Sequence, residues 1–186
     1  MKIDASFERI SKYANNDGIK LPTRKTTGSA GYDFYVAENT IIPSYITHLR
    51  NTLADFVALH STNELISLEE MSNFTKEHNC RPTLVPTGIK CRMPEDYYLQ
   101  LSVRSSLPLK NWLILANGVG IIDSDYYNNP DNEGHIFFQL FNLTAHPILL
   151  KRGDCFGQGI LLPYGICANE DKVTATRNGG FGSTSA

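Results

Sequence analysis

Five short segments of the chain concentrate glycine, aspartate, arginine and serine, the residue types that bind phosphate groups and activate water. Arg104, Ser105 and Ser106 place a guanidinium and two hydroxyls in a row, and these donors suit phosphate oxygens. Asp123 follows two isoleucines, so its carboxylate begins near apolar surroundings, and partial burial would suit it to general-base work. The other segments are residues 30–34, 152–158 and 177–184.

Each segment also has a plainer structural interpretation. Asp33 suits a turn that leads into a strand, and Arg104 suits a solvated loop. Residues 174–186 are rich in glycine and hydroxyl residues, which is typical of a flexible terminus. No segment alone therefore indicates a function. A single aromatic residue among these glycines, Phe181, gains nothing from a core and hints at docking on a flat partner.

The elements that position these segments have the patterns of short strands. Residues 97–103 alternate strictly between apolar and polar side chains, as in a half-buried strand, and Arg104 follows directly. Ile136, Phe138 and Leu140 alternate similarly. Shorter candidate strands are residues 34–37, 83–91, 113–116, 148–150 and 155–162. Many short strands separated by turn clusters predict an all-β sandwich or barrel, and the lack of strand–helix alternation disfavours a Rossmann-type sheet.

One stretch, residues 51–78, departs from the strand pattern. Leu53, Phe56 and Val57 have helical spacing, and Ser67 followed by Glu70 forms a capping box. We therefore predict a small helical insertion at about residues 50–80 within one domain spanning residues 1–186. Three of the five histidines lie in or beside it, His48, His60 and His78, but their spacing matches no common metal-ligand pattern.

The composition excludes several classes of protein. The chain has 186 residues, a formal net charge of -2, 41% hydrophobic residues and 19% charged residues, which is typical of an ordinary globular domain. The balanced charge disfavours a nucleic-acid partner, because such binders rely on many basic contacts to phosphate. No apolar run is long enough for a membrane span, the N-terminus has no signal-peptide core, and the four cysteines form no C-x-x-C pair. We expect a cytoplasmic protein that does not bind membranes.

The order and spacing of the five segments together resemble the trimeric dUTPase (dUTP diphosphatase) family. The motif A-G-x-D corresponds to residues 30–33 and R-S-(S/G) to residues 104–106. The motif G-(x)-I-D-x-D-Y corresponds to residues 120–126. The last two, G-D-x-x-x-Q and R-x-G-G-F-G-S-T, correspond to residues 153–158 and 177–184. Other segments, such as the one around Pro86 and Gly88, look like the branch found in low-GC Gram-positive bacteria.

The resemblance implies a fold and a reaction. The fold would be a β jelly roll with a helical insertion, assembled as a threefold homotrimer with active sites at subunit contacts. A C-terminal arm at about residues 174–186 would close each site, and in relatives this tail lies far from its own third motif. The reaction would be hydrolysis of dUTP to dUMP and pyrophosphate, in which Asp123 deprotonates a water that attacks the α-phosphorus. The cofactor would be Mg²⁺, with Asp33 holding one of its waters.

The resemblance also implies the substrate contacts. Arg104, Ser105 and Gln158 would contact phosphates, although the residues do not decide between Ser105 and Ser106. Arg177 would approach the γ-phosphate. Asn117 would bind the uracil edge, because an amide offers both donor and acceptor. Further expected contacts are Tyr126 under the deoxyribose, Phe181 stacked on the uracil, and Gly120, Ile122 and Gly182.

Two alternatives and several departures accompany this hypothesis. A dCTP deaminase shares the fold, but it needs a general-base glutamate where this chain has Gln139, and an amide cannot relay a proton. A non-catalytic interaction protein would be favoured by loss of Asp123 or Arg177, and both are present. Residues 127–130 form a longer turn than the family's usual glycine, and residues 177–180 are one residue shorter than the common pattern.

Overall fold

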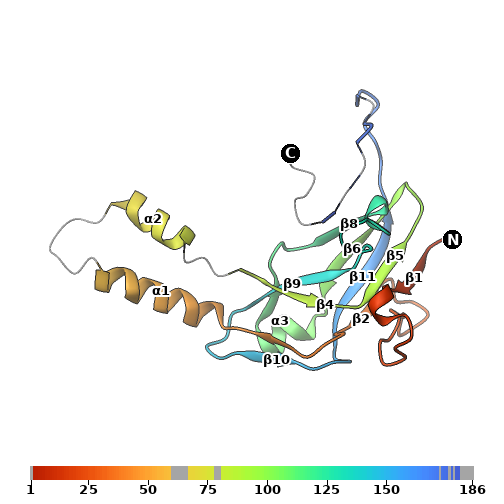
Figure 1. Cartoon of the computed structure of the whole chain (residues 1–186). Coiled ribbons are helices and arrows are strands. Elements are labelled where there is room, and N and C mark those ends of the chain that lie inside the picture. Colours follow the sequence, from red (N-terminus) through yellow and green to blue (C-terminus); the bar gives the residue numbers. More distant parts are fainter. Residues whose placement is uncertain are drawn as a thin grey trace.

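The computed structural model describes residues 2–59, 67–77, 81–171, 173–175, 177 and 179–180. In this part of the chain most elements are strands, as predicted (Figure 1). The strands are β1 (Ser6–Arg9), β2 (Tyr32–Tyr35), β3 (Thr40–Ile42), β4 (Thr83–Pro86), β5 (Ile89–Arg92), β6 (Tyr97–Val103), β7 (Leu113–Leu115), β8 (Gly120–Asp123), β9 (Phe137–Asn142), β10 (Ile148–Leu150) and β11 (Cys155–Pro163). The helices are α1 (Tyr45–Leu59), α2 (Leu68–Glu77) and α3 (Ser106–Asn111), with short 3-10 turns η1 (Ser11–Tyr13) and η2 (Ser124–Tyr126).

Two antiparallel sheets form the centre of the fold. One has the strand order β2-β11-β6-β8 and the other β4-β9-β7, and the pairs β1-β5 and β10-β3 form two further sheets of two strands each. Aromatic rings join the sheets: Phe138 of β9 lies 5.6 Å from Phe34 and 4.8 Å from Phe156 between ring centroids. Gly157 of β11 allows this approach, because a Cβ there would lie 2.4 Å from the Phe138 ring. The expected β-sandwich is therefore confirmed, with the core between its sheets.

Strand β6 organises the candidate functional segments. Its alternation is as predicted, with Tyr97, Leu99 and Leu101 buried. On one side it pairs with β8, so that Leu101 lies opposite Gly120 and Tyr98 opposite Asp123. On its other side it pairs with β11, which carries the fourth motif. The third and fourth motifs therefore lie on opposite edges of one strand.

Several strands differ from the prediction. Residues 83–91 form two strands, β4 and β5, because Gly88 between them has φ +71°, which an extended strand does not allow. Strand β2 begins two residues earlier than the predicted residue 34. The strands β1, β3 and β8 were not predicted, because each has only three or four residues and too little alternation to distinguish it.

The helical insertion is present and begins earlier than predicted. Helix α1 starts at Tyr45 because the Ser44 hydroxyl accepts a hydrogen bond from the Thr47 amide at 2.9 Å. The predicted capping box is confirmed, since the Glu70 amide donates to Ser67 Oγ at 3.1 Å and the Ser67 amide donates to the Glu70 carboxylate at 2.9 Å. His60 and His78 lie outside the described residues.

Figure 1 shows α1 and α2 projecting to one side of the strands. The two helices contact each other through Phe56 and Phe74, whose ring centroids are 5.1 Å apart. Helix α1 contacts the strands where the ring of Tyr45 lies 4.9 Å from that of Phe141 in β9. None of the helices in the described chain is long and apolar enough to cross a membrane.

Candidate active site

A cavity of about 180 Å³ opens beside the third motif. Its apolar walls come from neighbouring strands, with Leu101 of β6, Leu115 of β7 and Phe137 of β9. Polar groups at the same cavity come from Asn117 and Gln139. The predicted residues that line it are Asn117, Gly120, Ile122, Asp123, Tyr126 and Arg177. An apolar pocket with a few convergent polar groups suits a planar, hydrogen-bonding ligand.

The end of β8 positions Asp123. Its backbone is extended (φ −77°, ψ 158°), and the chain then turns into η2, which brings Asp125 and Tyr126 beside it. The Asp123 side chain is 48% exposed and its partner is the guanidinium of Arg177. The apolar surroundings suggested by the two preceding isoleucines are therefore only partly present, because Ile121 is itself half exposed.

Arg177 connects the tail to this cavity. Its Nη2 donates to Asp123 Oδ2, and its Nε donates to Asp125 Oδ1 at 2.8 Å. Its guanidinium also lies over the ring of Tyr126, 5.9 Å from the centroid. One arginine thus contacts three residues of the third motif.

Gly180 continues the contact of the tail with Tyr126. A Cβ at Gly180 would come within 2.9 Å of the Tyr126 ring, so only glycine fits this approach. The expectation that the tail lies far from its own third motif is therefore wrong for Arg177 and Gly180. Phe181 and Gly182, two predicted substrate contacts, lie outside the described residues.

Two further features shape the cavity wall. Asn117 sits at a tight turn in which its carbonyl accepts from the Val119 amide at 2.8 Å and Gly118 has φ +71°. Gln139 projects into the same cavity because it occupies the face of β9 opposite buried Phe138 and Leu140. Sequence reasoning considered Gln139 only for the deaminase alternative, although the alternation of β9 could have placed it beside Asn117.

The first, second and fourth motifs meet in a separate cluster, which we call the phosphate cluster: Lys25, Asp33, Arg104, Ser105 and Gln158. These residues line a cavity of about 410 Å³. Gln158 of β11 lies opposite Asp33 of β2 on one side and Ser102 of β6 on the other, and its Nε2 donates to Ser102 Oγ at 3.1 Å. Ser106, the remaining predicted contact, begins α3. Lys25 was missed because nothing in its neighbourhood marks it as part of a motif.

Asp33 is the most buried charged group of the phosphate cluster. Its side chain is 9% exposed, and Oδ1 lies 3.6 Å from Nε of Arg104. Its other oxygen, Oδ2, is buried and has no hydrogen-bond partner in the described chain. A carboxylate oxygen only accepts hydrogen bonds, so Oδ2 suits a donor such as a metal-bound water. This geometry fits the Mg²⁺ that the resemblance implies.

The two groups of residues are well separated within one chain. Asp123 lies opposite Tyr98, near the start of β6, whereas Arg104 follows its other end. The six residue steps from Tyr98 to Arg104 correspond to roughly 20 Å of extended chain. The structure therefore brings the third and fifth motifs together, and separately the first, second and fourth.

Comparison with known proteins shows which family the chain belongs to. The dUTPase family model matches residues 68–185. The chain is 37% identical to the deoxyuridine 5'-triphosphate nucleotidohydrolase of Lactococcus lactis over the full length of both, and 30% identical to that of Wolbachia pipientis wMel over 98% of this chain and 96% of the relative. The crystal structure of dUTPase from Streptococcus mutans superposes with a TM-score of 0.65 at 36% identity, covering 88% of this chain and 98% of that one. The predicted likeness to the low-GC Gram-positive branch is confirmed, and the chain belongs to the dUTPase family.

Proposed function

We propose that this chain hydrolyses dUTP to dUMP and pyrophosphate, assisted by Mg²⁺. The observation that carries the proposal is the convergence of Asn117, Asp123, Tyr126 and Arg177 on one small cavity, because these groups suit uracil, water, deoxyribose and phosphate respectively. The reaction would keep uracil out of DNA and supply dUMP for dTTP synthesis. Free thiols at Cys91, Cys155 and Cys167 are compatible with a reducing compartment, so the cytoplasm is the proposed location.

Base and sugar selection would come from the cavity walls. The amide of Asn117 offers a donor and an acceptor, which matches the carbonyl–imide edge of uracil. The buried ring of Tyr126 would lie under the deoxyribose and leave no space for a 2′-hydroxyl. Gly120 and Ile122 would contribute backbone and apolar contacts, while Phe181 and Gly182 would cover the base.

The chemical step would depend on Asp123. Its carboxylate would orient a water molecule and take its proton as the water attacks the α-phosphorus, with pyrophosphate leaving. Arg177 already bonds this carboxylate, so we propose that the guanidinium moves onto the γ-phosphate when the nucleotide binds, leaving Asp123 to the water.

The phosphate cluster would hold the triphosphate. Arg104, Ser105 and Gln158 supply donors at the cavity, with Ser106 close by at the start of α3. The unpartnered Oδ2 of Asp33 would accept from a water of the metal. Bound Mg²⁺ would supply charge neutralisation for the triphosphate.

The separation between the cavity and the phosphate cluster supports a homotrimer. Groups that lie roughly 20 Å apart along the length of β6 cannot both hold the reacting part of one nucleotide. Combining the cavity of one subunit with the phosphate cluster of another removes this conflict, and a closed threefold ring would form three such sites.

The alternatives differ in what they predict for a panel of nucleotides. The purified protein is incubated with dUTP, dCTP, dTTP and UTP, and both pyrophosphate and ammonia are measured. We expect pyrophosphate from dUTP at a rate far above that from the other nucleotides. Ammonia from dCTP would favour the deaminase, although the amide of Gln139 in the cavity argues against a proton relay there. No product from any nucleotide would favour the non-catalytic protein.

A further inference from the structure

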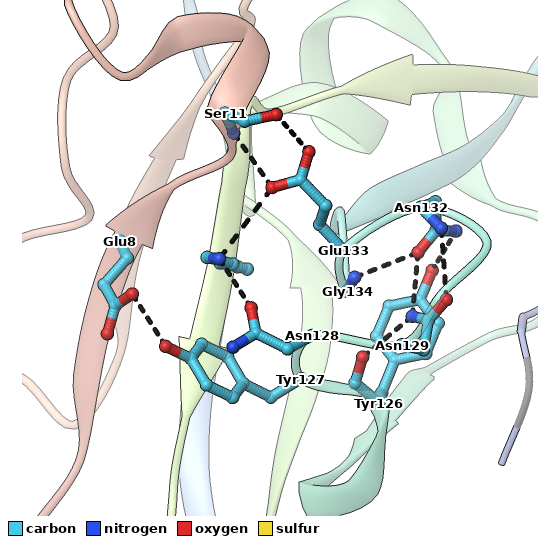
Figure 2. A network of polar contacts seen from close by, with 10 residues as sticks. Glu8, Ser11, Tyr126, Tyr127, Asn128, Asn129, Asn132, Glu133 and Gly134 are labelled. Atoms are coloured by element: carbon cyan, nitrogen blue, oxygen red, sulfur yellow. Dashed lines mark hydrogen bonds and ion pairs between the residues drawn. The ribbon is translucent and has the colours of Figure 1, made fainter.

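The longer turn after the third motif, residues 127–135, is held by a dense set of hydrogen bonds (Figure 2). Asn129 is 4% exposed and uses its whole amide. Its Nδ2 donates to the Tyr126 carbonyl at 2.8 Å and to Asn132 Oδ1 at 2.9 Å. Its Oδ1 accepts from the amides of Asp131 and Asn132, both at 3.1 Å. A buried asparagine satisfied in this way fixes the path of the turn.

The backbone of the turn is unusual. Asn128, Glu133 and Gly134 all have positive φ, at 57°, 62° and 80°. A Cβ at Gly134 would lie 2.6 Å from the Tyr126 carbonyl oxygen, so the chain returns directly onto the third motif. Such a backbone persists only where its surroundings determine it, and it is found most often near functional sites.

Asn132 reaches from this turn to the phenol of Tyr126. Its Nδ2 donates to Tyr126 Oη at 2.8 Å, and Oη in turn donates to the His135 carbonyl at 3.0 Å. The orientation of the Asn132 amide is determined, because its Oδ1 already accepts from Gly134 N at 3.0 Å and from Asn129. Burial raises the pKa of Tyr126, so the phenol stays protonated and keeps its donor role at neutral pH.

The ring held in this way serves two parts of the cavity. One edge of Tyr126 lies against Gly180 of the tail, and its face lies under the guanidinium of Arg177. Asn132 itself does not line the cavity, so it affects the site only through the position of this ring.

A second group of contacts ties the outer side of the turn to the N-terminal strands. Tyr127 Oη donates to Glu8 of β1 at 2.7 Å, and the Ser11 amide donates to Glu133 at 3.0 Å. Lys90 of β5 donates to Asn128 at 2.6 Å. Figure 2 shows the contacts of Tyr127 with Glu8 and of Glu133 with Ser11 on the side of the turn away from the phenol of Tyr126. A substitution among these outer contacts serves as a control, because it changes the turn but leaves the hydrogen bond between Asn132 and the phenol of Tyr126 in place.

We propose that Asn132 is a positioning residue that fixes the ring of Tyr126 and thereby sets the discrimination between deoxyribose and ribose nucleotides. The inference rests on the proposed function, in which this ring lies under the sugar. A ring free to tilt would admit the 2′-hydroxyl that a fixed ring excludes, because selection against one small group depends on how tightly the pocket is shaped.

The test compares kcat/KM for dUTP with kcat/KM for UTP in four variants. The variants are Asn132→Ala, Tyr126→Phe, the double variant, and Tyr127→Phe as the matched control, which loses a phenol hydroxyl from the outer side of the turn. We expect Asn132→Ala to lower the dUTP-to-UTP ratio about tenfold, a usual effect of one lost contact on selectivity. Tyr126→Phe should lower it similarly, and the double variant no further, because both remove the same hydrogen bond. Tyr127→Phe should keep the ratio within about twofold of wild type.

The outcomes test the role of Asn132 separately from the proposed hydrolysis of dUTP. A folded Asn132→Ala variant with an unchanged ratio, or losses that multiply in the double variant, would overturn the inference while leaving dUTP hydrolysis intact. If Asn132→Ala does not fold, Tyr126→Phe removes only the two hydrogen bonds of the phenol oxygen, leaves the bonds of Asn129 in place, and decides the matter by the same ratio. A wild-type protein that does not hydrolyse dUTP would overturn the proposed function, and this inference with it.

Discussion

The guanidinium of Arg177 bonds the carboxylate of Asp123, although 54 residues of chain separate them. The same guanidinium donates to Asp125, so Arg177 of the tail is bonded to two acidic side chains of the third motif. Only 21% of the Arg177 side chain is exposed. The residue proposed to bind the γ-phosphate and the residue proposed to activate water are therefore in direct contact before either performs its role.

Removing the tail should cost most of the activity while leaving the subunit folded. Truncation after Thr176 removes Arg177 and Gly180, which contact the end of β8 and the turn after it but are not part of the hydrophobic core. We expect kcat to fall roughly 10³-fold or more, since a lost arginine at a phosphoryl group costs that much. Phe181→Ala should be milder, because it spares Arg177. Rates equal to full length, in a truncated protein of unchanged mass and circular dichroism, would mean that the tail is only a terminus.

The proposed active sites, which combine two subunits, make a specific prediction for mixed trimers. Asp123→Asn and Arg104→Ala should each be inactive alone. When the two are unfolded, mixed and refolded together, about a quarter of wild-type activity should return, because statistically that share of sites pairs an intact Asp123 with an intact Arg104. Light scattering of the same sample checks that its mass is that of a trimer. A mixture that stays inactive, or a monomer that is active, would show that one chain builds the whole site.

If Asp33 holds a metal-bound water as proposed, the dependence of turnover on Mg²⁺ concentration should change when Asp33 is substituted. Chelator should abolish turnover and added Mg²⁺ restore it, because the triphosphate needs its charge neutralised. Asp33→Asn should raise the Mg²⁺ concentration for half-maximal activity more than about tenfold, the usual effect of losing a partner of a metal ligand. Asp17→Asn removes a carboxylate that is fully exposed and serves as the control. Equal Mg²⁺ requirements in the two variants would remove Asp33 from the metal site.

His135 should make stability depend on pH. Burial lowers the pKa of this histidine to about 4 from an ordinary value of 6.5, with Lys12 adding to the shift and Glu38 and Glu133 opposing it. Its Nε2 accepts from the Gly88 amide at 2.8 Å, so the folded protein needs the neutral ring. The unfolded chain takes up a proton below pH 6.5, and stability should therefore be full above that pH. Stability should fall by about 3 kcal/mol as pH drops from 6.5 to 4.

Urea unfolding at a fixed protein concentration measures this loss. The variant His135→Gln keeps a side-chain acceptor but cannot titrate in this range, so its free energy of unfolding should lack the histidine's share of the slope. A wild-type slope no steeper than that of His135→Gln between pH 6.5 and 4 would rule out the histidine as the cause.

The sequence predicted what depends on local pattern and spacing. The alternation of residues 97–103 gave β6 with its bounds, and Ser67 with Glu70 gave the cap of α2, because neighbouring residues determine both. The motif spacing predicted the family. The ion pair between Arg177 and Asp123 could not be predicted, since a contact between residues 54 positions apart leaves no local pattern in the sequence. The hydrogen bonds of Asn132 could not be predicted either, because they join side-chain and backbone groups that only the folded chain brings together.

The most direct test of the proposed reaction is hydrolysis of dUTP in water enriched in ¹⁸O, with mass analysis of both products. Attack of water on the α-phosphorus predicts one ¹⁸O in dUMP and none in pyrophosphate. Asp123→Asn should bind a non-hydrolysable analogue normally and lose roughly 10²–10⁴-fold in kcat, whereas Asp125→Asn, the same change two residues away, should lose far less. Label in the pyrophosphate, or an Asp123→Asn variant that turns over at the rate of Asp125→Asn, would contradict the proposal.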